Sequence, residues 1–297
     1  FSFYYVSAPW TIYKNIKRLM PGHYLLLKNG NIEINRYWKF SFKEERMAKQ
    51  ECIGEIKKAF LNSVKRHLHS EVPLGVFLSS GLDSTSIVAM MSKLEQKIKT
   101  YTIGYENGKS YNEIDEAKLV AKKYNTEHYD CILKPKQIED FLPEIIKHLA
   151  EPHGDWTQVA FYYLSKQSKR DITVVLSGAG GDELFAGYPR YLLSHFADLY
   201  HKCPNWIKQG IIINGASIIP NKAPFFRYIK KIAFSNPDVM VRNIRWMSNF
   251  LPEDKANLYS DNIKGILPGN YSGSMPKMEY PQPSDGNVLD SLMYLDM

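Results

Sequence analysis

A run of small polar residues with a single acid lies between a short apolar stretch and a helical pattern. The run is Ser79-Ser80-Gly81-Leu82-Asp83-Ser84, and the apolar stretch before it is Leu74–Leu78. The unpaired N–H groups at the start of a helix favour an anion, and a glycine lets the backbone approach that anion closely. The serine hydroxyls add further donors. The run therefore predicts a site for the pyrophosphate part of ATP.

Asp83 is the unexpected member of this run, because a carboxylate beside a polyphosphate is repelled unless a cation lies between them. We therefore interpret Asp83 as a Mg²⁺ ligand. The order Ser-x-Gly-x-Asp-Ser resembles the loop of the PP-loop pyrophosphatases, which cleave ATP to AMP and pyrophosphate. A capped helix after a core strand would explain Ser84 or Asp83 alone, but it does not explain the whole run.

A second glycine-rich run follows another apolar stretch, Ile172–Leu176. It reads Ser177-Gly178-Ala179-Gly180-Gly181-Asp182-Glu183-Leu184-Phe185-Ala186-Gly187-Tyr188. In a doubly wound sheet this run can face the first one, so that Asp83 and Asp182 would bind one Mg²⁺ from two sides. The alternative is a glycine-rich helix cap in which Asp182 and Glu183 serve only the first turn.

The elements that would position both runs alternate along the chain. Strands are predicted at Leu74–Leu78, Lys99–Tyr105, His128–Leu133 and Ile172–Leu176, and helices at Glu51–Leu68, Ser84–Leu94, Asn112–Tyr124, Pro135–Leu149 and Thr157–Lys169. This order predicts an α/β fold with a doubly wound parallel sheet and ligands at the carboxyl ends of its strands. Before it, Asn29-Gly30 between two short apolar runs predicts a β-hairpin.

The composition is that of a globular protein with about two domains. Of the 297 residues, 44% are hydrophobic and 23% are charged, and no apolar run reaches the roughly 20 residues that would span a bilayer. The three cysteines show no spacing typical of metal sites or disulfide frameworks, so a cytoplasmic protein is expected. Cys131 falls in a predicted strand and is interpreted as a buried small hydrophobe.

The net charge of +7 is concentrated in one segment, from Tyr200 to Arg245. Its basic residues are Lys202, Lys208, Lys222, Arg227, Lys230, Lys231, Arg242 and Arg245, and its one acid is Asp238. A patch for nucleic acid or a membrane surface is one reading, and a solvated helical face is the commoner one. The aromatic residues of the segment look like core positions rather than stacking platforms, so nucleic acid is not expected. They are Phe225, Phe226, Tyr228 and Phe234.

The two runs belong to a longer set of matching motifs. The set includes Tyr101-Thr102-Ile103-Gly104-Tyr105, Thr126-Glu127-His128, Glu151-Pro152 with Asp155, and Asp182-Glu183-Leu184-Phe185-Ala186-Gly187-Tyr188. Together they resemble the synthetase domain of the glutamine-hydrolysing asparagine synthetases. Tyr5-Val6-Ser7-Ala8-Pro9, Pro21-Gly22-His23-Tyr24 and Arg36-Tyr37-Trp38 are similar to the end of that family's N-terminal glutaminase domain. The resemblance weakens after residue 191. We expect residues 1–41 to end the glutaminase domain, 42–191 to form the ATP-binding synthetase domain, and 192–297 to form its helical part.

The resemblance implies a fold and a reaction. The fold would be a doubly wound parallel sheet of the PP-loop (adenine nucleotide alpha hydrolase-like) type, preceded by a β-rich remnant of an Ntn-type glutaminase domain and followed by a helical region. The enzyme would be a ligase that activates the side-chain carboxylate of aspartate as an acyl-adenylate, and ammonia from glutamine would displace AMP to give asparagine. The cofactors would be ATP and Mg²⁺. The partners would be small-molecule substrates and not a membrane, and a homodimer is compatible with this interpretation.

The resemblance also assigns roles to single residues. Leu78 and Ile103 would contact adenine or ribose through the backbone, and Ser177 with Gly178 would hold the nucleotide. The pyrophosphate would lie among Ser79, Ser80, Gly81, Asp83 and Ser84. Asp83 and Asp182 would bind Mg²⁺, and Glu151, Asp155 and Glu183 would line the substrate site. Glu151 and Asp155 could equally cap a helix.

Two positions depart from the family's pattern. Ser80 stands where the family usually has glycine, a change that the backbone can tolerate. Ala179 stands where the family has an acidic residue, which is expected to remove a proton from the attacking nitrogen. Such a base contributes roughly 10²- to 10⁴-fold to a rate, so Ala179 puts amide formation in question and no catalytic base is assigned. Asp182 or Glu183 would compensate only weakly.

The ends of the sequence suggest a piece of a longer protein. It begins with Phe1 rather than methionine and stops at Met297 within an apolar pattern. The family's glutaminase nucleophile, an N-terminal cysteine, and a later lysine that contacts pyrophosphate are expected outside these residues. The 297 residues alone would then not hydrolyse glutamine.

Three alternatives stay open. A related amidotransferase would form an amide on another carboxylate, such as one on a polysaccharide or a peptide, because the loops do not specify the acceptor. A nucleotide-binding module with decayed catalysis would fit Ala179. A PP-loop enzyme that modifies nucleic acid would use the basic segment, and its binding would depend strongly on salt.

Overall fold

The computed structural model describes residues 2–40, 47–94, 97–106, 108, 112–208, 224–266 and 288–296. The chain forms two compact units. The sheet unit comprises residues 10–17 and 43–180, and the helical unit comprises residues 1–9, 18–42 and 181–297. The three predicted domains remain a prediction, and their first boundary, between residues 41 and 42, lies outside the described residues.

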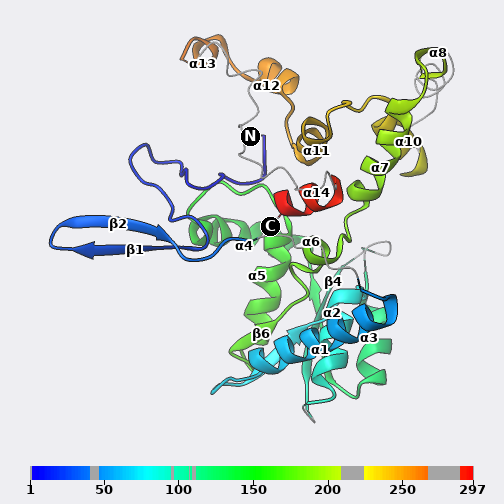
Figure 1. Ribbon diagram of the computed structural model, residues 1–297. Coiled ribbons are helices and arrows are strands. Elements are labelled where there is room, and N and C mark those ends of the chain that lie inside the picture. The colour runs from blue at the N-terminus through cyan, green and yellow to red at the C-terminus, as the bar shows by residue number, and fades with distance from the viewer. Residues whose placement is uncertain are drawn as a thin grey trace. The chain divides into compact units, whose positions relative to one another are not determined.

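The sheet unit is built on four parallel strands (Figure 1). They are β3 (Leu74–Phe77), β4 (Lys99–Tyr105), β5 (Glu127–Leu133) and β6 (Val174–Leu176). Their order across the sheet is β5-β4-β3-β6. The predicted α/β fold with a parallel sheet is thereby confirmed, and the apolar runs that predicted the strands differ from them only at the ends.

Helices cover both faces of this sheet. On one face lie α1 (Lys49–His67), α2 (Leu82–Met91) and α3 (Ile114–Lys123), and on the other lies α5 (Thr157–Ser168), with α4 (Pro135–Leu149) packed on α5. Successive residues of β3 serve the two faces, because side chains alternate along a strand. Val76 packs in the core under α1, α2 and α3, and Phe77 packs with residues of α5. Cys131 is buried in the second cluster, and burial raises the pKa of its thiol to about 11, as expected for a hydrophobic rather than a reactive cysteine.

The helical unit contains one hairpin and a series of helices. Strands β1 (His23–Lys28) and β2 (Asn31–Arg36) pair antiparallel around Asn29 and Gly30, whose φ values are 53° and 81°. These positive φ values are typical of the tight hairpin that Asn-Gly predicts. The helices are α6 (Gly181–Phe185), α7 (Pro189–Lys202), α8 (Asn205–Ile207), α10 (Pro224–Ala233), α11 (Val239–Met247), α12 (Pro252–Leu258), α13 (Asp261–Ile266) and α14 (Val288–Asp296). No helix in the described ranges is long and apolar enough to cross a bilayer.

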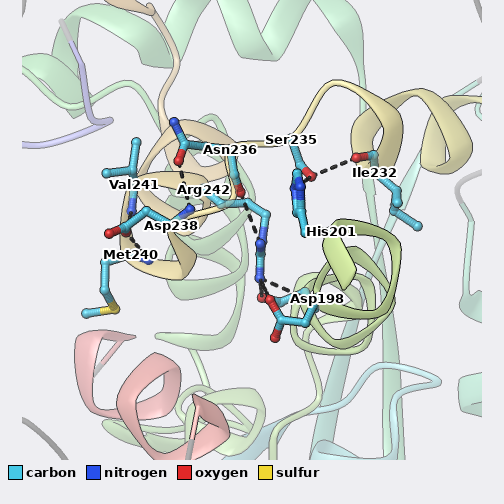
Figure 2. Close-up of polar contacts among 10 residues, drawn as sticks. Asp198, His201, Ile232, Ser235, Asn236, Asp238, Met240, Val241 and Arg242 are labelled. Carbon is cyan, nitrogen blue, oxygen red and sulfur yellow. Dashed lines mark hydrogen bonds and ion pairs between the residues drawn. The ribbon is translucent and has the colours of Figure 1, made fainter. Parts of the chain in front are cut away.

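Arg242 of α11 is fully buried and ties α11 to α7 (Figure 2). Its Nη2 donates to Asp198 Oδ1 at 2.5 Å and to Ser194 Oγ at 2.8 Å. Its Nη1 donates to the carbonyl of Asn236 at 3.0 Å. A buried guanidinium is tolerated only with such partners. Arg242 is therefore a packing element and not part of a solvated basic face, which corrects the reading of this residue from sequence.

The prediction that the aromatic residues of the basic segment occupy core positions is wrong for two of them. Tyr228 is 40% exposed and Phe234 is 60% exposed. The reason is that α10 packs on α7 and buries Ala233, which leaves the flanks of α10 in solvent. The side chains of Phe225 and Phe226 lie outside the described set.

Two partly buried histidines, His128 and His201, have lowered pKa values, which favours their neutral forms. Nδ1 of His128 on β5 lies 2.9 Å from Thr100 Oγ1, and its Nε2 lies 3.3 Å from Asp130 Oδ1 without a hydrogen bond. Burial lowers the pKa of His128, and Asp130 opposes this shift only in part. Burial, and then the charges of Arg242 and Lys208, also lower the pKa of His201.

Lowering the pH below about 6.5 should therefore reduce the free energy of unfolding. A histidine with a depressed native pKa binds its proton more readily in the unfolded chain. The stability that it contributes is present above the unfolded pKa and is lost as the pH falls through the native pKa. Urea unfolding at pH about 7.5 and about 5.5 measures the change. His128→Gln should weaken this pH dependence, and His69→Gln, at an exposed histidine, should leave it intact; equal behaviour of the two variants would contradict the prediction.

Candidate functional site

The two loops, Ser79–Ser84 and the glycine-rich run that begins at Ser177, lie where the strand order of the sheet reverses. From β3 the chain adds β4 and then β5 on one side, and β6 is added on the other side of β3. In doubly wound sheets, ligands bind outside the carboxyl ends of the strands at such a switch point. The first loop follows β3, and the second follows β6. The fold therefore positions both loops at one place on the sheet edge.

The first loop is folded on its own serine hydroxyls. Ser84 Oγ accepts from the N–H of Ser79 at 3.1 Å and lies 2.8 Å from Ser79 Oγ. Ser79 Oγ in turn accepts from the N–H of Gly81 at 3.2 Å. Helix α2 begins directly afterwards, at Leu82, with Asp83 in its first turn. The loop thus brings hydroxyls and a helix N-terminus together, which is the arrangement that favours phosphate.

The end of β3 is tied to β4 immediately before this loop. The N–H of Leu78 donates to the carbonyl of Tyr101 at 2.9 Å, and the carbonyl of Leu78 accepts from Thr102 Oγ1 at 2.6 Å. Leu78 is 3% exposed. Ile103 follows Tyr101 and Thr102 on β4. A backbone contact from Leu78 to adenine or ribose would therefore have to use the second lone pair of its carbonyl, and the roles of Leu78 and Ile103 remain predictions.

The second loop packs directly against the first. A Cβ built on Gly178 would lie 2.9 Å from the backbone N of Ser84 and 3.0 Å from Asp83 Cβ. Only a glycine leaves room for this approach. Ser177 beside it is partly buried, whereas Ala179 is exposed. The structure thus brings together Gly178, Asp83 and Ser84, as expected for two loops that face each other.

The acids that follow the second loop belong to the helical unit. Asp182 and Glu183 start the short helix α6. Glu183 Oε1 accepts from the hydroxyl of Tyr188 at 2.6 Å, and the guanidinium of Arg190 lies 3.8 Å from the centre of the Tyr188 ring. Burial and then the bond to Glu183 raise the pKa of Tyr188, so this hydroxyl stays protonated. Asp83 belongs to the sheet unit and Asp182 to the helical unit. The binding of one Mg²⁺ by both residues therefore stays a prediction.

Glu151 and Asp155 lie in the connection between α4 and α5. Asp155 Oδ1 accepts from the N–H of Thr157 at 2.9 Å, at the start of α5. This is the capping role that the sequence left open for Asp155. A substrate-lining role for either residue remains a prediction.

One residue at the first loop carries no sequence signal that points to it. Glu113 precedes α3, and its Oε2 accepts from the N–H of Ser80 at 2.9 Å. In sequence, Glu113 looks like one more acid near a helix start, among Asp115 and Glu116. Its partner is distant in the chain, so only the fold reveals the contact: α3 packs on β4 and β5, and β4 is the neighbour of β3 in the sheet.

Comparisons with known proteins place the chain among its relatives. Residues 55–297 match the family described as Asparagine synthase. Asparagine synthetase [glutamine-hydrolyzing] 1 of Bacillus subtilis is 31% identical over 100% of this chain and 46% of its own length. Putative asparagine synthetase [glutamine-hydrolyzing] 2 of Methanocaldococcus jannaschii is 33% identical over 70% of this chain and 41% of its own. Amidase chyE of Penicillium rubens is 23% identical over 65% of this chain and 32% of its own. The chain thus spans less than half the length of these relatives.

The family match covers the parts of the chain that carry the site. It begins within α1 and takes in all four parallel strands, both loops and the helices that follow them. It therefore agrees with the motifs from which the family was predicted, and with the parallel sheet that positions them. On this combined evidence the chain belongs to the Asparagine synthase family.

Proposed function

We propose that this chain is the synthetase part of an ATP-dependent ligase that forms an amide on the side chain of aspartate. The observation that carries the proposal is the packing of Gly178 against Asp83 and Ser84, because it joins two loops of phosphate-binding type at the switch point of the sheet. The names of the Bacillus subtilis and Methanocaldococcus jannaschii relatives support the type of reaction. The glutamine-hydrolysing step is proposed only for the protein as the cell makes it.

The proposed chemistry makes a poor electrophile reactive. A carboxylate resists attack until one of its oxygens becomes a good leaving group, so the aspartate side chain would first attack the α-phosphate of ATP and release pyrophosphate. Ammonia would then displace AMP from the acyl-adenylate to give asparagine. Ser79, Gly81 and Ser84 would hold the pyrophosphate with hydroxyl and backbone donors, and Ser177 with Gly178 would hold the rest of the nucleotide.

The donors near the first loop fit Mg²⁺. This ion is usually held by one or two carboxylates together with substrate phosphates, rather than by a cage of protein ligands. Within the described residues there is no group of three or more His, Cys, Asp or Glu side chains that could hold a metal alone, which agrees with such a shared site. Asp83 and Asp182 would bind the ion, as the resemblance of the two runs to the family implies. Bound there, Mg²⁺ would offset the charge that builds on the departing pyrophosphate.

Amide formation requires that a proton be removed from the attacking ammonia. Ala179 offers no group that accepts a proton, and Glu183 already accepts a hydrogen bond from the hydroxyl of Tyr188. We therefore propose that the natural chain forms the amide without a protein base at residue 179.

The test is the formation of AMP and pyrophosphate from Mg·ATP, measured with the protein as the cell makes it. Aspartate with ammonia is compared with ammonia alone. AMP formation that depends on aspartate, together with asparagine in the products, is the expected result. Mg·ATP binding without any turnover would instead favour a nucleotide-binding module with decayed catalysis.

Ala179→Glu is expected to raise the rate of asparagine formation by roughly 10²- to 10⁴-fold, because it restores a general base. Ala179 is exposed, so the larger side chain needs no repacking. Ala179→Gln has the same size without the base and serves as the control, for which no gain is expected. The rate is measured at saturating ammonia, so that the supply of ammonia does not limit it and the variants are compared in the proton-removal step. Equal rates for the two variants would mean that no base is needed at residue 179.

A related amidotransferase acting on another carboxylate is the second candidate. The relative from Penicillium rubens carries a different name, amidase, so similarity alone does not decide the acceptor. ATP binding with AMP formation from another carboxylate, and none from aspartate, would favour this candidate. A nucleic-acid substrate is less favoured, since Arg242 of the basic segment is buried and paired with Asp198; strongly salt-dependent RNA binding would reverse that judgement.

A further inference from the structure

Glu113 places a carboxylate on the first loop (Ser79–Ser84), which is the phosphate loop of the proposed function. Its Oε2 accepts a hydrogen bond from the N–H of Ser80 at 2.9 Å. Ser80 lies between two other residues of the loop, Ser79 and Gly81, whose N–H groups are also donors. The N–H groups of Ser79 and Gly81 also have acceptors inside the chain, but these are the uncharged hydroxyls of Ser84 and Ser79. The Ser80 amide thus differs from its neighbours, because its acceptor carries the same sign of charge as a phosphate.

The position of Glu113 is fixed on both sides along the chain. Before it, Asn112 clasps the backbone of Tyr105, since Oδ1 accepts from the Tyr105 N–H at 2.6 Å and Nδ2 donates to the Tyr105 carbonyl at 3.0 Å. After it, the Ile114 side chain packs on β4 so closely that a Cβ on Gly104 would collide with it. Burial, and next the Glu113 charge, raise the pKa of Tyr105, which agrees with a carboxylate held at this place. The contacts of the neighbouring residues therefore hold the Glu113 carboxylate at the loop.

A placed carboxylate changes which ligands the loop accepts. A bare polyphosphate that approaches the Ser80 amide meets a like charge, and two anions on neighbouring donors repel. A polyphosphate that carries a divalent cation has a smaller net negative charge, so the repulsion from Glu113 lowers its affinity less. A glutamine in the same place would keep a carbonyl oxygen for the Ser80 N–H and remove the charge.

We propose that Glu113 is a specificity-determining residue that makes the phosphate loop select polyphosphates bound to a divalent cation over bare anions. The proposal rests on the proposed function, because it takes Mg·ATP as the ligand of the loop. It adds to that function a reason why free ATP, pyrophosphate or inorganic phosphate would not occupy the site in place of Mg·ATP.

The experiment is a set of titrations by calorimetry with three probes, on the protein as the cell makes it. The probes are Mg·ATP, ATP with a chelator, and pyrophosphate with a chelator. We expect Glu113→Gln to bind the two metal-free probes about fivefold or more tightly than the natural protein, and to change its affinity for Mg·ATP by less than about twofold. Glu116→Gln removes the same charge from the first turn of the same helix, and it should change none of the three affinities.

The ratio of metal-free to Mg·ATP affinity separates the outcomes. A purely structural contact would lower all affinities together in Glu113→Gln and leave the ratio as it was, which would overturn the inference. An equal shift in the ratio for Glu116→Gln would also overturn it, since the effect would then be general charge and not the contact with Ser80. Failure of the folded natural protein to bind Mg·ATP would overturn the proposed function and the inference with it. Mg·ATP binding with an unchanged ratio would overturn the inference alone.

Discussion

Gly178→Ala is expected to lower the affinity for Mg·ATP by about tenfold or more, and to lower the free energy of unfolding by about 1–3 kcal/mol. The added Cβ would lie 2.9 Å from the backbone N of Ser84 and 3.0 Å from Asp83 Cβ. Because one of these atoms is backbone and both belong to the first turn of α2, the overlap can be relieved only if the two loops move apart. Calorimetric titration with Mg·ATP and urea unfolding measure the two effects.

Gly54→Ala is the matched control for this change. Gly54 lies within α1, where a Cβ would meet nothing within 4 Å. It should leave the affinity for Mg·ATP unchanged and stabilise the protein by about 0.5–1 kcal/mol, because alanine favours a helix interior over glycine. Nucleotide binding by Gly178→Ala at the natural affinity would show that the two loops do not hold the ligand together.

Arg242→Met is expected to lower the free energy of unfolding of the helical unit by about 3 kcal/mol. The methionine fills part of the volume but leaves Asp198 and Ser194 without the donors of the guanidinium. The side chain of Asp198 is 27% exposed and can regain water, so the loss should stay below the upper end of the range for buried pairs. Urea unfolding followed by tryptophan fluorescence is suitable, because the Trp246 ring lies 5.8 Å from the guanidinium.

Arg227→Met provides the comparison from the same basic segment. Arg227 is exposed on α10, and its replacement should change stability by less than about 0.5 kcal/mol. Arg242→Lys should lie between the two, because a lysine keeps the charge but cannot serve Asp198, Ser194 and Asn236 at once. If Arg242→Met were as stable as Arg227→Met, the contact between α7 and α11 would not depend on this ion pair.

The sheet could be predicted from sequence because its signal is local. Apolar runs bounded by polar turns marked β3, β4, β5 and β6, and β4 at Lys99–Tyr105 agrees in both bounds with the predicted strand. The hairpin was predicted equally well, since Asn29 and Gly30 can adopt the positive φ values that the turn requires. In such cases neighbouring residues alone decide the structure.

Those parts of the candidate site that depend only on the order of strands and helices could be predicted from the sequence. Alternating strands and helices predicted that both loops lie at strand ends, and the contact of Gly178 with Asp83 agrees with that reading. The contact of Glu113 with Ser80 was not predictable in this way, because it depends on where α3 begins relative to a loop far away in sequence. The same holds for Arg242, which a charge count assigns to a solvated face. Its burial depends on Asp198, a residue on another helix.

The order of the strands also determines when the site can form as the chain folds. Gly75 pairs with Lys99 on one side of β3, but Leu74 pairs with Val174 on the other, across a much longer stretch of chain. Closing long stretches costs more conformational entropy and slows folding. The contact between Gly178 and the start of α2 must follow the arrival of β6, which makes it a late event in folding. A nascent chain that ends before β6 would therefore present the first loop without the second, and the proposed nucleotide site would be too incomplete to be stabilised by ligand.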